Sequence, residues 1–579
     1  MSGRWQQLGP QDDAVAQDGD RAFAGVDMRR DAALLEPGLC AEAVNKVFSQ
    51  GRAETRRGWR TRRWARELTV DFPLSFPFDF ARETGFGRVW GQGVFSDPYG
   101  QEFAVLVCGN VAYRIADGCP VDAIAYPSGV VIDGPVTLTQ AFNVLLMWRG
   151  EDKDPMRLET GTDFSRAFAW EVVPKESAPD YTSTIPGAAR GLYHGSRVWV
   201  AFDGSRVAYS DVLSYTRWDA TLSEIYVNSG SDDRLVRLVA MGDNTILAFK
   251  DQSIYAINGV LPDPAGARLD VVTTERGAVA AESIVQSGKD VLFLSDAGVF
   301  AISQALDNRL QAGADAISGP IQPLLDRVNW AYAGNACAVV HENRYLLALP
   351  VDGATYNNAV AVYDFLNRAW AGWWVGEWMD VAGWLQMDVG GRRRLLAVNG
   401  WGLANRRAHG AVLVCDDGFS DELFELTADV HDRLLSRAYS MGTMAHKAWM
   451  GAAVDIESWY GAGEFSLLRS GANLRSGLGS VVKDRSRNYV WNRPAWVPTN
   501  VNADHGAPFR EDYSVELVPN QAWHHGIAPG LHQRSTEQFR LREAARAVQV
   551  EISGSRGRMN VCAISVTAAQ DEESLRTKV

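Results

Sequence analysis

The sequence predicts an all-β fold, an irregular β-propeller of about six or seven blades with an N-terminal arm and an additional C-terminal β domain. A hairpin pattern that recurs along the chain is the first observation behind this prediction. Residues 244–259, NTILAFKDQSIYAING, hold two apolar strands around a polar turn, and residues 290–303, DVLFLSDAGVFAIS, repeat the same apolar positions. The second observation is that few stretches could hold a helix longer than three turns.

Regular spacing of the hairpins is the third observation. Their turns lie roughly 40 to 55 residues apart, the period at which four-stranded propeller blades repeat. A single blade leaves both faces uncovered, whereas a ring of blades covers them and hides most strand edges. A string of β-sandwich domains remains the alternative, because sandwiches also use regular hairpins. The same pattern recurs at 103–118, 143–161, 197–211, 343–365 and 392–418.

Changes in the pattern divide the chain into three parts. Residues 1–67 are expected to form an N-terminal arm and a first strand that carries a run of arginines. The propeller is expected over 68–430, and a separate C-terminal β domain, a platform or nozzle, over 431–579. Within that last part, AVQVEIS and MNVCAISVTA alternate and are joined by GSRGR, which predicts an antiparallel pair at the end of the chain.

Composition restricts the possible functions. With a net charge of -13, the chain lacks the excess of Lys and Arg that general DNA binding or adhesion to an anionic membrane requires. It has no run of about eighteen apolar residues and no apolar signal core, so we expect synthesis in a cytoplasm and no membrane insertion. Six scattered cysteines without a CxxC pair argue against a disulfide scaffold and a zinc ribbon, and predict small buried side chains.

No catalytic, metal or cofactor motif emerges, so the sequence predicts a protein that is not an enzyme and has no cofactor. Residues 84–93, TGFGRVWGQG, lack the third glycine of a dinucleotide fingerprint, and no phosphate-binding GxxxxGK[ST] is present. His524 and His525 are adjacent, and neighbours in an extended chain point to opposite faces, so they are poorly placed to share a metal.

An aromatic cluster keeps one other function open, a carbohydrate-binding or glycan-processing propeller. Residues 370–378, WAGWWVGEW, could stack on a sugar, although such clusters more often pack between blades. No pair of carboxylates is singled out by its spacing. A scaffolding propeller that collects protein partners is a third possibility, but it predicts a signature dipeptide in every blade, which we do not find.

A dense run of arginines interleaved with tryptophan is the clearest local anomaly. Arg beside Trp is the composition favoured in protein interfaces and phosphate contacts, so the run is a candidate intersubunit or partner contact. Solvation or pairing within the chain is the alternative. The candidate interface residues are Arg56, Arg57, Trp59, Arg60, Arg62, Arg63, Trp64 and Arg66.

An ordered set of segments resembles the tail nozzle, or tail tubular, proteins of short-tailed bacteriophages. It begins with AVNKVFSQGRAETRRGW, in which TRRGW stands where a proline often precedes the glycine in that family, and it closes with AVQVEISGSRGRMNVCAISV. Together the segments cover most of the chain, although residues 469–530 match nothing in that family. They are residues 43–59, 195–218, 233–259, 273–302, 343–373 and 547–566.

The resemblance implies a structural protein of the virion tail, which is present in the host cytoplasm during assembly. Such proteins form a homo-oligomeric ring, a hexamer, below the portal and its adaptor, also called the head-to-tail connector. Their rings continue the DNA channel, retain the genome and let it pass at ejection, and tail fibres or spikes are further partners of the family. An acidic wall suits this role, because it repels the phosphate backbone and lets genomic DNA slide without sequence-specific binding.

Overall fold

The computed structural model describes most of the chain between residues 15 and 570. The described ranges are 15–61, 89–97, 100–117, 122–159, 169–175, 177–178, 181–182, 185–219, 223–304, 310–312, 316–399, 411–423, 426–443, 446–470, 483–493 and 533–570. Within them the chain is a β protein, as predicted, and helical structure is confined to short pieces. These are α1 (Gln322–Leu325), η1 (Ala32–Leu34), η2 (Pro264–Gly266), η3 (Ala281–Ser283), η4 (Gly319–Ile321) and η5 (Trp330–Asn335).

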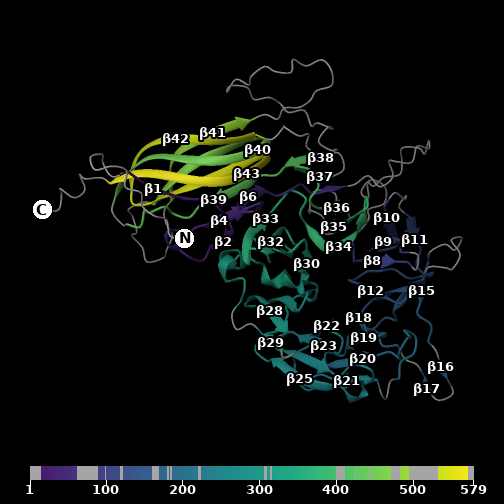
Figure 1. Cartoon of the computed structure of the whole chain (residues 1–579). Coiled ribbons are helices and arrows are strands. Elements are labelled where there is room, and N and C mark those ends of the chain that lie inside the picture. The colour runs from purple at the N-terminus through teal and green to yellow at the C-terminus, as the bar shows by residue number, and fades with distance from the viewer. Residues whose placement is uncertain are drawn as a thin grey trace, which may run out of the picture.

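Antiparallel four-stranded units make up the middle of the chain (Figure 1). The first three are β8 (Gly91–Ser96), β9 (Glu102–Val107), β10 (Ala112–Ala116) and β11 (Asp122–Ile124); β12 (Thr137–Ala141), β13 (Val144–Trp148), β14 (Met156–Glu159) and β15 (Trp170–Val172); and β18 (Gly191–His194), β19 (Arg197–Phe202), β20 (Arg206–Tyr209) and β21 (Glu224–Tyr226). A small pair, β16 (Ser177–Ala178) and β17 (Tyr181–Thr182), lies between the second and third units in sequence.

Four further units continue the series. They are β22 (Leu235–Ala240), β23 (Thr245–Lys250), β24 (Ile254–Asn258) and β25 (Arg268–Thr273); β26 (Val285–Ser287), β27 (Asp290–Ser295), β28 (Gly298–Gln304) and β29 (Leu310–Ala312); β30 (Cys337–His341), β31 (Arg344–Leu349), β32 (Ala359–Asp364) and β33 (Ala369–Trp374); and β34 (Val381–Val389), β35 (Arg392–Asn399) and β36 (Ala411–Val414), completed by β7 (Arg60–Thr61).

Each predicted hairpin is the pair of second and third strands of one unit. In the 244–259 hairpin, Ile246 lies opposite Ile257, and both side chains are fully buried. The turn of the 197–211 hairpin has positive φ at Asp203 and Gly204, 51° and 65°, as a two-residue hairpin turn requires. Local turn residues and alternating apolar positions therefore place these strands correctly.

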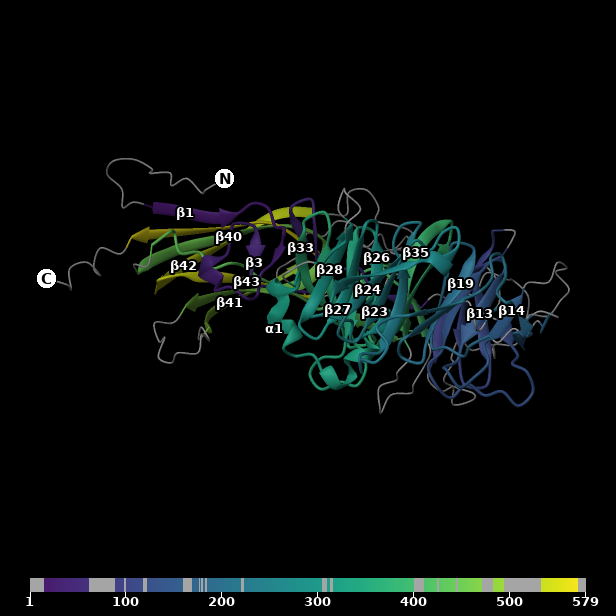
Figure 2. The ribbon, with the colours of Figure 1, turned by 90° about the horizontal axis from the view of Figure 1, so that it is seen from below.

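The units pack against one another in sequence and close on themselves. Their first strands lie side by side: β8 with β12, β12 with β18, β18 with β22, β26 with β30, β30 with β34, and β34 with β8. The fourth and fifth units share apolar side chains such as Leu247 and Phe293. The last and first units share others, including Leu106 and Val398. We call this part, residues 89–429 with β7, the ring of sheets (Figures 1 and 2).

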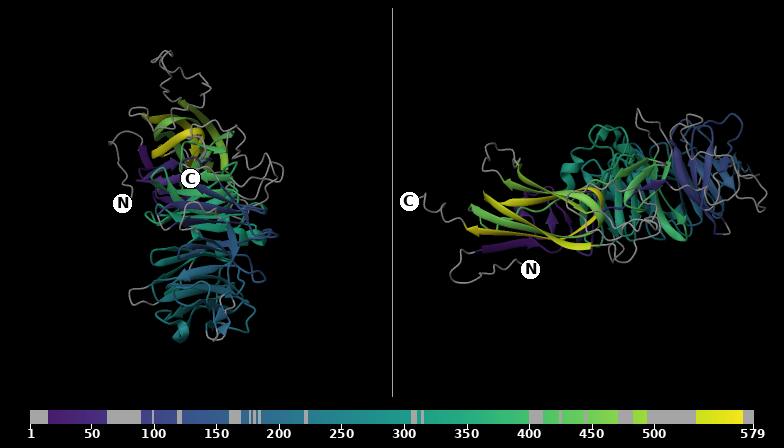
Figure 3. Two further views of the ribbon diagram at one scale, coloured as in Figure 1. Left: turned by 90° about the vertical axis from the view of Figure 1, so that its right-hand side faces the viewer. Right: turned by 90° about the horizontal axis from the view of Figure 1, so that it is seen from above.

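A sheet of long strands extends away from the ring of sheets (Figures 2 and 3). We call it the long sheet, and its central strands are β40 (Lys447–Ser470) and β43 (Val548–Gln570), of 24 and 23 residues. β40 also pairs with β41 (Lys483–Arg493) and β42 (Gln533–Ala545), and β43 pairs with β39 (Asp432–Leu435). Except for β41, the segment 469–530 lies almost wholly outside the described residues.

The structure near the end of the chain differs from the predicted antiparallel pair of strands. GSRGR was expected to be a turn between two strands, but β43 runs through it as one strand and stays paired with β40. The register shifts between Ala462 and Gly463, opposite this segment, and the one extra residue, Ser555, forms a β-bulge. Glycine and serine next to alternating apolar residues are compatible with either outcome, and the long partner strand decides it.

The N-terminal segment also differs from the prediction of an arm with one strand. Residues 15–61 hold seven strands: β1 (Val15–Asp20), β2 (Gly25–Val26), β3 (Leu39–Cys40), β4 (Glu42–Val44), β5 (Lys46–Ser49), β6 (Arg52–Thr55) and β7. β1 and β6 pair with β43, and β4 pairs with β39 of the long sheet and with β33 of the ring. β7 enters the last unit between β36 and β37 (Ser420–Leu423), which pairs in turn with β38 (Leu426–Asp429). The segment therefore belongs to both parts.

Candidate functional site at the junction of the ring and the long sheet

Buried charged side chains gather where the N-terminal segment joins the ring of sheets to the long sheet. Arg56, Asp421, Lys46 and Asp432 are all under 6% exposed. Burying charges is costly unless each is paired and hydrogen-bonded, so these pairs fix how the two parts meet. We take this junction as the candidate functional site because it positions the molecule's two parts.

Arg56 is the best satisfied of these charges. Its Nη1 and Nη2 donate to the two carboxylate oxygens of Asp421 at 2.8 and 2.5 Å. The other guanidinium hydrogens go to Asn45 Oδ1 at 2.9 Å and to the carbonyls of Arg57 and Val375 at 3.0 and 3.2 Å. All five donors of the guanidinium are thus used within the chain.

Asn45 connects Arg56 to both parts of the molecule. Its Oδ1 accepts from Arg56 and from the backbone N–H of Val375 at 2.9 Å, and its Nδ2 donates to the carbonyl of His431 at 2.6 Å. Val375 follows the last strand of the sixth unit, and His431 directly precedes β39 of the long sheet. The φ of Asn45 is +54°, a left-handed conformation that asparagine tolerates better than most residues.

Trp59 lies beside this cluster and is 1% exposed. Its backbone N–H donates to Asp421 Oδ1 at 2.9 Å, and its ring lies 5.9 Å from the Arg56 guanidinium. The rings of Trp59 and Trp384 pack in a T-shaped arrangement with their centroids 5.6 Å apart. The Arg and Trp composition that suggested an interface therefore forms an intramolecular core at these two residues.

The rest of the arginine run divides between pairing and exposure. Arg60 is paired with Glu422 of the neighbouring strand β37, again within the chain. Arg57 is exposed, so a partner contact stays a prediction for this residue. Arg62, Arg63, Trp64 and Arg66 lie outside the described residues. For Arg56 and Trp59 the expectation of an intersubunit contact is corrected, because both side chains are buried inside the chain. Arg60 is only partly buried, so for this residue a partner contact in addition to the pair with Glu422 stays a prediction.

A second buried pair joins the N-terminal segment to the long sheet. Lys46 of β5 forms an ion pair with Asp432 of β39, and both side chains are almost fully buried. The Thr55 hydroxyl has one hydrogen to donate and two acceptors within reach, Asp432 Oδ2 at 3.2 Å and the carbonyl oxygen of Met559 at 3.0 Å. Gly554 of β43 permits this arrangement, because a Cβ there would lie 1.9 Å from Asp432 Oδ1.

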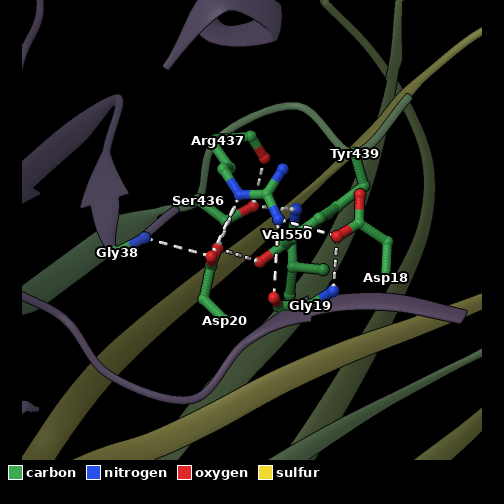
Figure 4. A network of polar contacts seen from close by, with 8 residues as sticks. All are labelled: Asp18, Gly19, Asp20, Gly38, Ser436, Arg437, Tyr439 and Val550. Carbon is green, nitrogen blue, oxygen red and sulfur yellow. Dashed lines mark hydrogen bonds and ion pairs between the residues drawn. The ribbon is translucent and has the colours of Figure 1, made fainter. Parts of the chain in front are cut away.

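A third network fastens β1 to the long sheet (Figure 4). Arg437 donates to Asp18 Oδ1 at 2.8 Å and to both oxygens of Asp20 at 3.0 and 3.1 Å. The hydroxyl of Tyr439 donates to Asp20 Oδ2 at 2.9 Å, and the backbone N–H of Gly38 donates to Oδ1 at 3.1 Å. Both carboxylate oxygens of Asp20 therefore accept hydrogen bonds from within the chain.

Electrostatics at this network follow from burial and from the two aspartates. Burial disfavours the charged guanidinium of Arg437, but Asp20 and Asp18 outweigh it and raise its pKa. Burial raises the pKa of Tyr439 well above its usual range, and the negative charge of Asp20 raises it further. Arg437 is thus held charged and Tyr439 neutral, the states that the hydrogen bonds require.

The cysteines match the expectation of small buried side chains. Cys40, Cys108, Cys337, Cys415 and Cys562 are buried and unpaired, and Cys119 lies outside the described residues. Burial raises the pKa of Cys108 to about 12 and that of Cys337 beyond its ordinary range. A thiol is a poor nucleophile when its thiolate is disfavoured in this way.

Three of the four tryptophans in the cluster at 370–378 pack inward, and the fourth, Trp378, is partly exposed. Trp370, Trp373 and Trp374 are at most 6% exposed. The indole N–H of Trp370 donates to the carbonyl of Ile317 at 2.8 Å, and that of Trp374 donates to the carbonyl of Lys46 at 3.0 Å. These three rings are therefore not available to stack on a sugar, and they belong to the core around the junction.

Sequence reasoning missed the partners of these charges. Asn45, Asp421 and Asp432 are the residues that give Arg56 and Lys46 their positions. Only Asn45 has an apolar neighbour, Val44, whereas Asp421 and Asp432 stand between polar or charged residues that give no sign of burial. No local sequence pattern predicts which distant charged residue Arg56 or Lys46 pairs with. Within the ranges that the structure covers, no group of His, Cys, Asp and Glu could hold a metal ion, and no helix is long and apolar enough to cross a membrane.

Comparisons with known proteins give only weak similarities. No family model and no curated protein matches the chain. Among solved structures, the extracellular domain of a hybrid two-component system of B. thetaiotaomicron has a TM-score of 0.35 at 8% identity over 57% of this chain, and this chain spans 40% of it. Saccharomyces cerevisiae Sqt1 has a TM-score of 0.35 at 10% sequence identity, and the match covers 57% of this chain and 95% of Sqt1. PorZ is a surface component of the type-IX secretion system of Porphyromonas gingivalis. It has a TM-score of 0.34 at 15% sequence identity, and the match covers 63% of this chain and 43% of PorZ. Scores this low carry no functional argument.

Proposed function

We propose that this chain is a non-catalytic structural protein of a bacteriophage tail, a subunit of a ring-shaped nozzle. In this proposal it continues the DNA channel below the portal and adaptor, retains the genome and lets it pass at ejection. The observation that carries the proposal is the shared N-terminal segment at the junction, which supplies strands to both the ring of sheets and the long sheet. Such coupling suits a part that must keep its geometry under load.

The ring of sheets is proposed to be a β-propeller of seven irregular blades. Seven units follow one another, and the last packs on the first. The insertion of β7 beside β36 supports this, because an N-terminal strand that completes the final unit closes the ring through hydrogen bonds between distant parts of the chain. A propeller presents broad, rigid rims that suit docking of neighbours and needs no catalytic residues.

Assembly into a homo-oligomeric ring, a hexamer in the proposal, has support from the long sheet. β41 lies at the end of the sheet order, paired among the described strands with β40 alone. A long strand with one free edge is suited to pairing with another chain. Arg57, exposed beside the buried Arg56, could contact a neighbouring subunit or the adaptor.

The partners proposed for the ring are the adaptor, further copies of the chain, and genomic DNA in the lumen, with tail fibres or spikes at the propeller rims. The net charge of -13 supports passage of DNA without sequence-specific binding, because like charges repel. The virion tail is the proposed location, after assembly in the host cytoplasm.

The decisive experiment is to image the full-length protein alone and with its adaptor ring. Mass photometry would give the stoichiometry, and class averages from electron microscopy would show whether six copies form a closed ring with the long sheets around a lumen. Protein that stays monomeric with the adaptor at micromolar concentration would contradict the proposal. Rings whose lumen is formed by the ring of sheets instead of the long sheet would contradict the orientation of the subunit.

A further inference from the structure

Three charged side chains from three different units of the ring of sheets meet at one point. Arg190 directly precedes β18, Arg237 lies in β22, and Glu282 lies in η3, just before β26. Arg190 Nε is 3.1 Å from Glu282 Oε1, and Arg237 Nη1 is 3.1 Å from Glu282 Oε2. Arg237 Nη1 also donates to the carbonyl of Ala281 at 2.8 Å.

This point lies near the centre of the ring of sheets. The units that contain β18 and β26 are not neighbours, because the unit of β22 lies between them. A direct contact between Arg190 and Glu282 is therefore possible only close to the middle, where the first strands converge. In addition, the charge of Glu282 acts on Cys337, the first residue of β30 in the next unit.

The three side chains together carry a net positive charge, and they are partly exposed to solvent. Partial desolvation of Glu282 favours its neutral form, but the two arginines outweigh this effect and lower its pKa, so the carboxylate remains ionised near neutral pH. Two guanidinium groups and one carboxylate leave one uncompensated positive charge in an acidic protein. The side chains of Arg190, Arg237 and Glu282 are 34, 32 and 43% exposed, so a solute can approach them.

Donors remain available at this point. Arg190 meets Glu282 through Nε, and Arg237 uses Nη1 for Glu282 and Ala281. Among the described residues, the terminal nitrogens of Arg190 and the Nη2 of Arg237 have no acceptor. Guanidinium groups bind oxyanions through paired N–H groups, and here both groups are held in place by one carboxylate.

We propose that Arg190 and Arg237 form a binding site for a small phosphate-like oxyanion at the centre of the ring of sheets, with Glu282 as a positioning residue. An oxyanion with several acceptor oxygens can take one N–H pair from each arginine and neutralise the excess charge. Both a free phosphate and a phosphate monoester present this chemistry. Binding at this site does not rest on the proposed nozzle function, because all three residues belong to a single chain and no contact between subunits is needed.

Calorimetric titration of the full-length protein with inorganic phosphate, and separately with ribose 5-phosphate, tests the site at low ionic strength. Binding of either ligand, weakened at least tenfold in Arg190→Gln and in Arg237→Gln, is the expected result. Arg268→Gln is the matched control: its arginine is paired with Asp270 on the outer strand β25 and exposed, so its loss should leave binding unchanged. Binding of inorganic phosphate alone would indicate a site for the free anion, and binding of the sugar phosphate would indicate a monoester.

A second measurement uses the unaltered protein and so does not depend on the folding of variants. Phosphate should slow phenylglyoxal modification of Arg190 and Arg237 severalfold, as followed by peptide mass spectrometry, and leave Arg268 unaffected. Absence of binding by both ligands, equal binding by the glutamine variants that fold, or no protection of Arg190 and Arg237 would each overturn the proposal.

Discussion

Arg56 and Asp421, separated by 365 residues, form a bidentate ion pair with hydrogen bonds of 2.8 and 2.5 Å in the buried junction. The same carboxylate accepts the backbone N–H of Trp59, directly before β7. The pair therefore locks the N-terminal segment into the last unit of the ring of sheets at the point where the long sheet begins. An arginine that a sequence pattern marks as a surface contact here holds the interior together.

Replacing Arg56 by Met should lower the free energy of unfolding by about 3 to 5 kcal/mol, because Asp421 would be left buried without its countercharge. The double variant Arg56→Met with Asp421→Leu should recover part of this loss, since it removes both charges. Urea unfolding measures the change. Arg268→Met, which removes an exposed arginine, should cost less than about 1 kcal/mol, and an Arg56→Met cost no larger than this would contradict the role of the pair.

Comparing Gly372→Ala with Gly353→Ala should separate the energetic cost of a steric clash from the cost of a left-handed backbone conformation. Gly372 of β33 has a φ of +88°, and a Cβ there would lie 2.0 Å from the carbonyl oxygen of Ala43 in β4. Gly353 has a similar φ of +78° but nothing within 4 Å. Gly353→Ala should therefore cost about 1 to 2 kcal/mol, the cost of the left-handed conformation alone.

Gly372→Ala should cost clearly more than Gly353→Ala in the same thermal or urea measurement, because β4 must also move away from β33. Equal costs in the two variants would show that the contact between the N-terminal segment and the ring of sheets is not tight at this point.

Tyr439 should make the protein sensitive to alkali. Its pKa is raised well above the ordinary 10.0 by burial and by Asp20, so its contribution to stability is complete below about pH 10 and is lost as pH rises from there toward the raised value. In Tyr439→Phe the fall in stability above pH 10 should be shallower by up to about 1.4 kcal/mol per pH unit, the contribution of one proton.

The measurement is a series of urea unfolding curves between pH 8 and pH 11. Tyr226→Phe serves as the control, because it removes a hydroxyl of the same kind from a side chain that is 57% exposed and outside the network of Figure 4. If Tyr439→Phe and the unaltered protein decline in parallel, Tyr439 does not titrate with unfolding as the network in Figure 4 requires.

The buried cysteines should resist modification in the folded protein. Burial raises the thiol pKa of Cys40, Cys108, Cys337 and Cys415, and Cys562 is buried as well. In a Cys119→Ser variant, we expect less than one thiol to react with a chromogenic disulfide reagent within minutes at pH 8, and all of the remaining thiols to react after denaturation. Rapid reaction of any of these five cysteines in the folded protein would contradict their burial.

The sequence by itself determined the strands of the ring of sheets. Each predicted hairpin, from 103–118 to 392–418, appears as two adjacent strands, because alternation of apolar residues and the backbone demands of turns such as Asp203-Gly204 act over a few residues. The recurrence of the hairpin also predicted several similar units, and an all-β chain follows from both signals.

Only the tertiary structure decided what the N-terminal segment does. Val15 pairs with Ala569, and Arg56 with Asp421; contacts across such separations leave no periodicity in either segment. The arginine run illustrates the limit, because composition records the number of charges and not whether a distant carboxylate reaches them. Burial of Arg56 is favourable only when the fold brings Asn45 and Asp421 to it. The sequence pattern therefore predicted an exposed interface residue, whereas the tertiary structure places Arg56 in the buried junction.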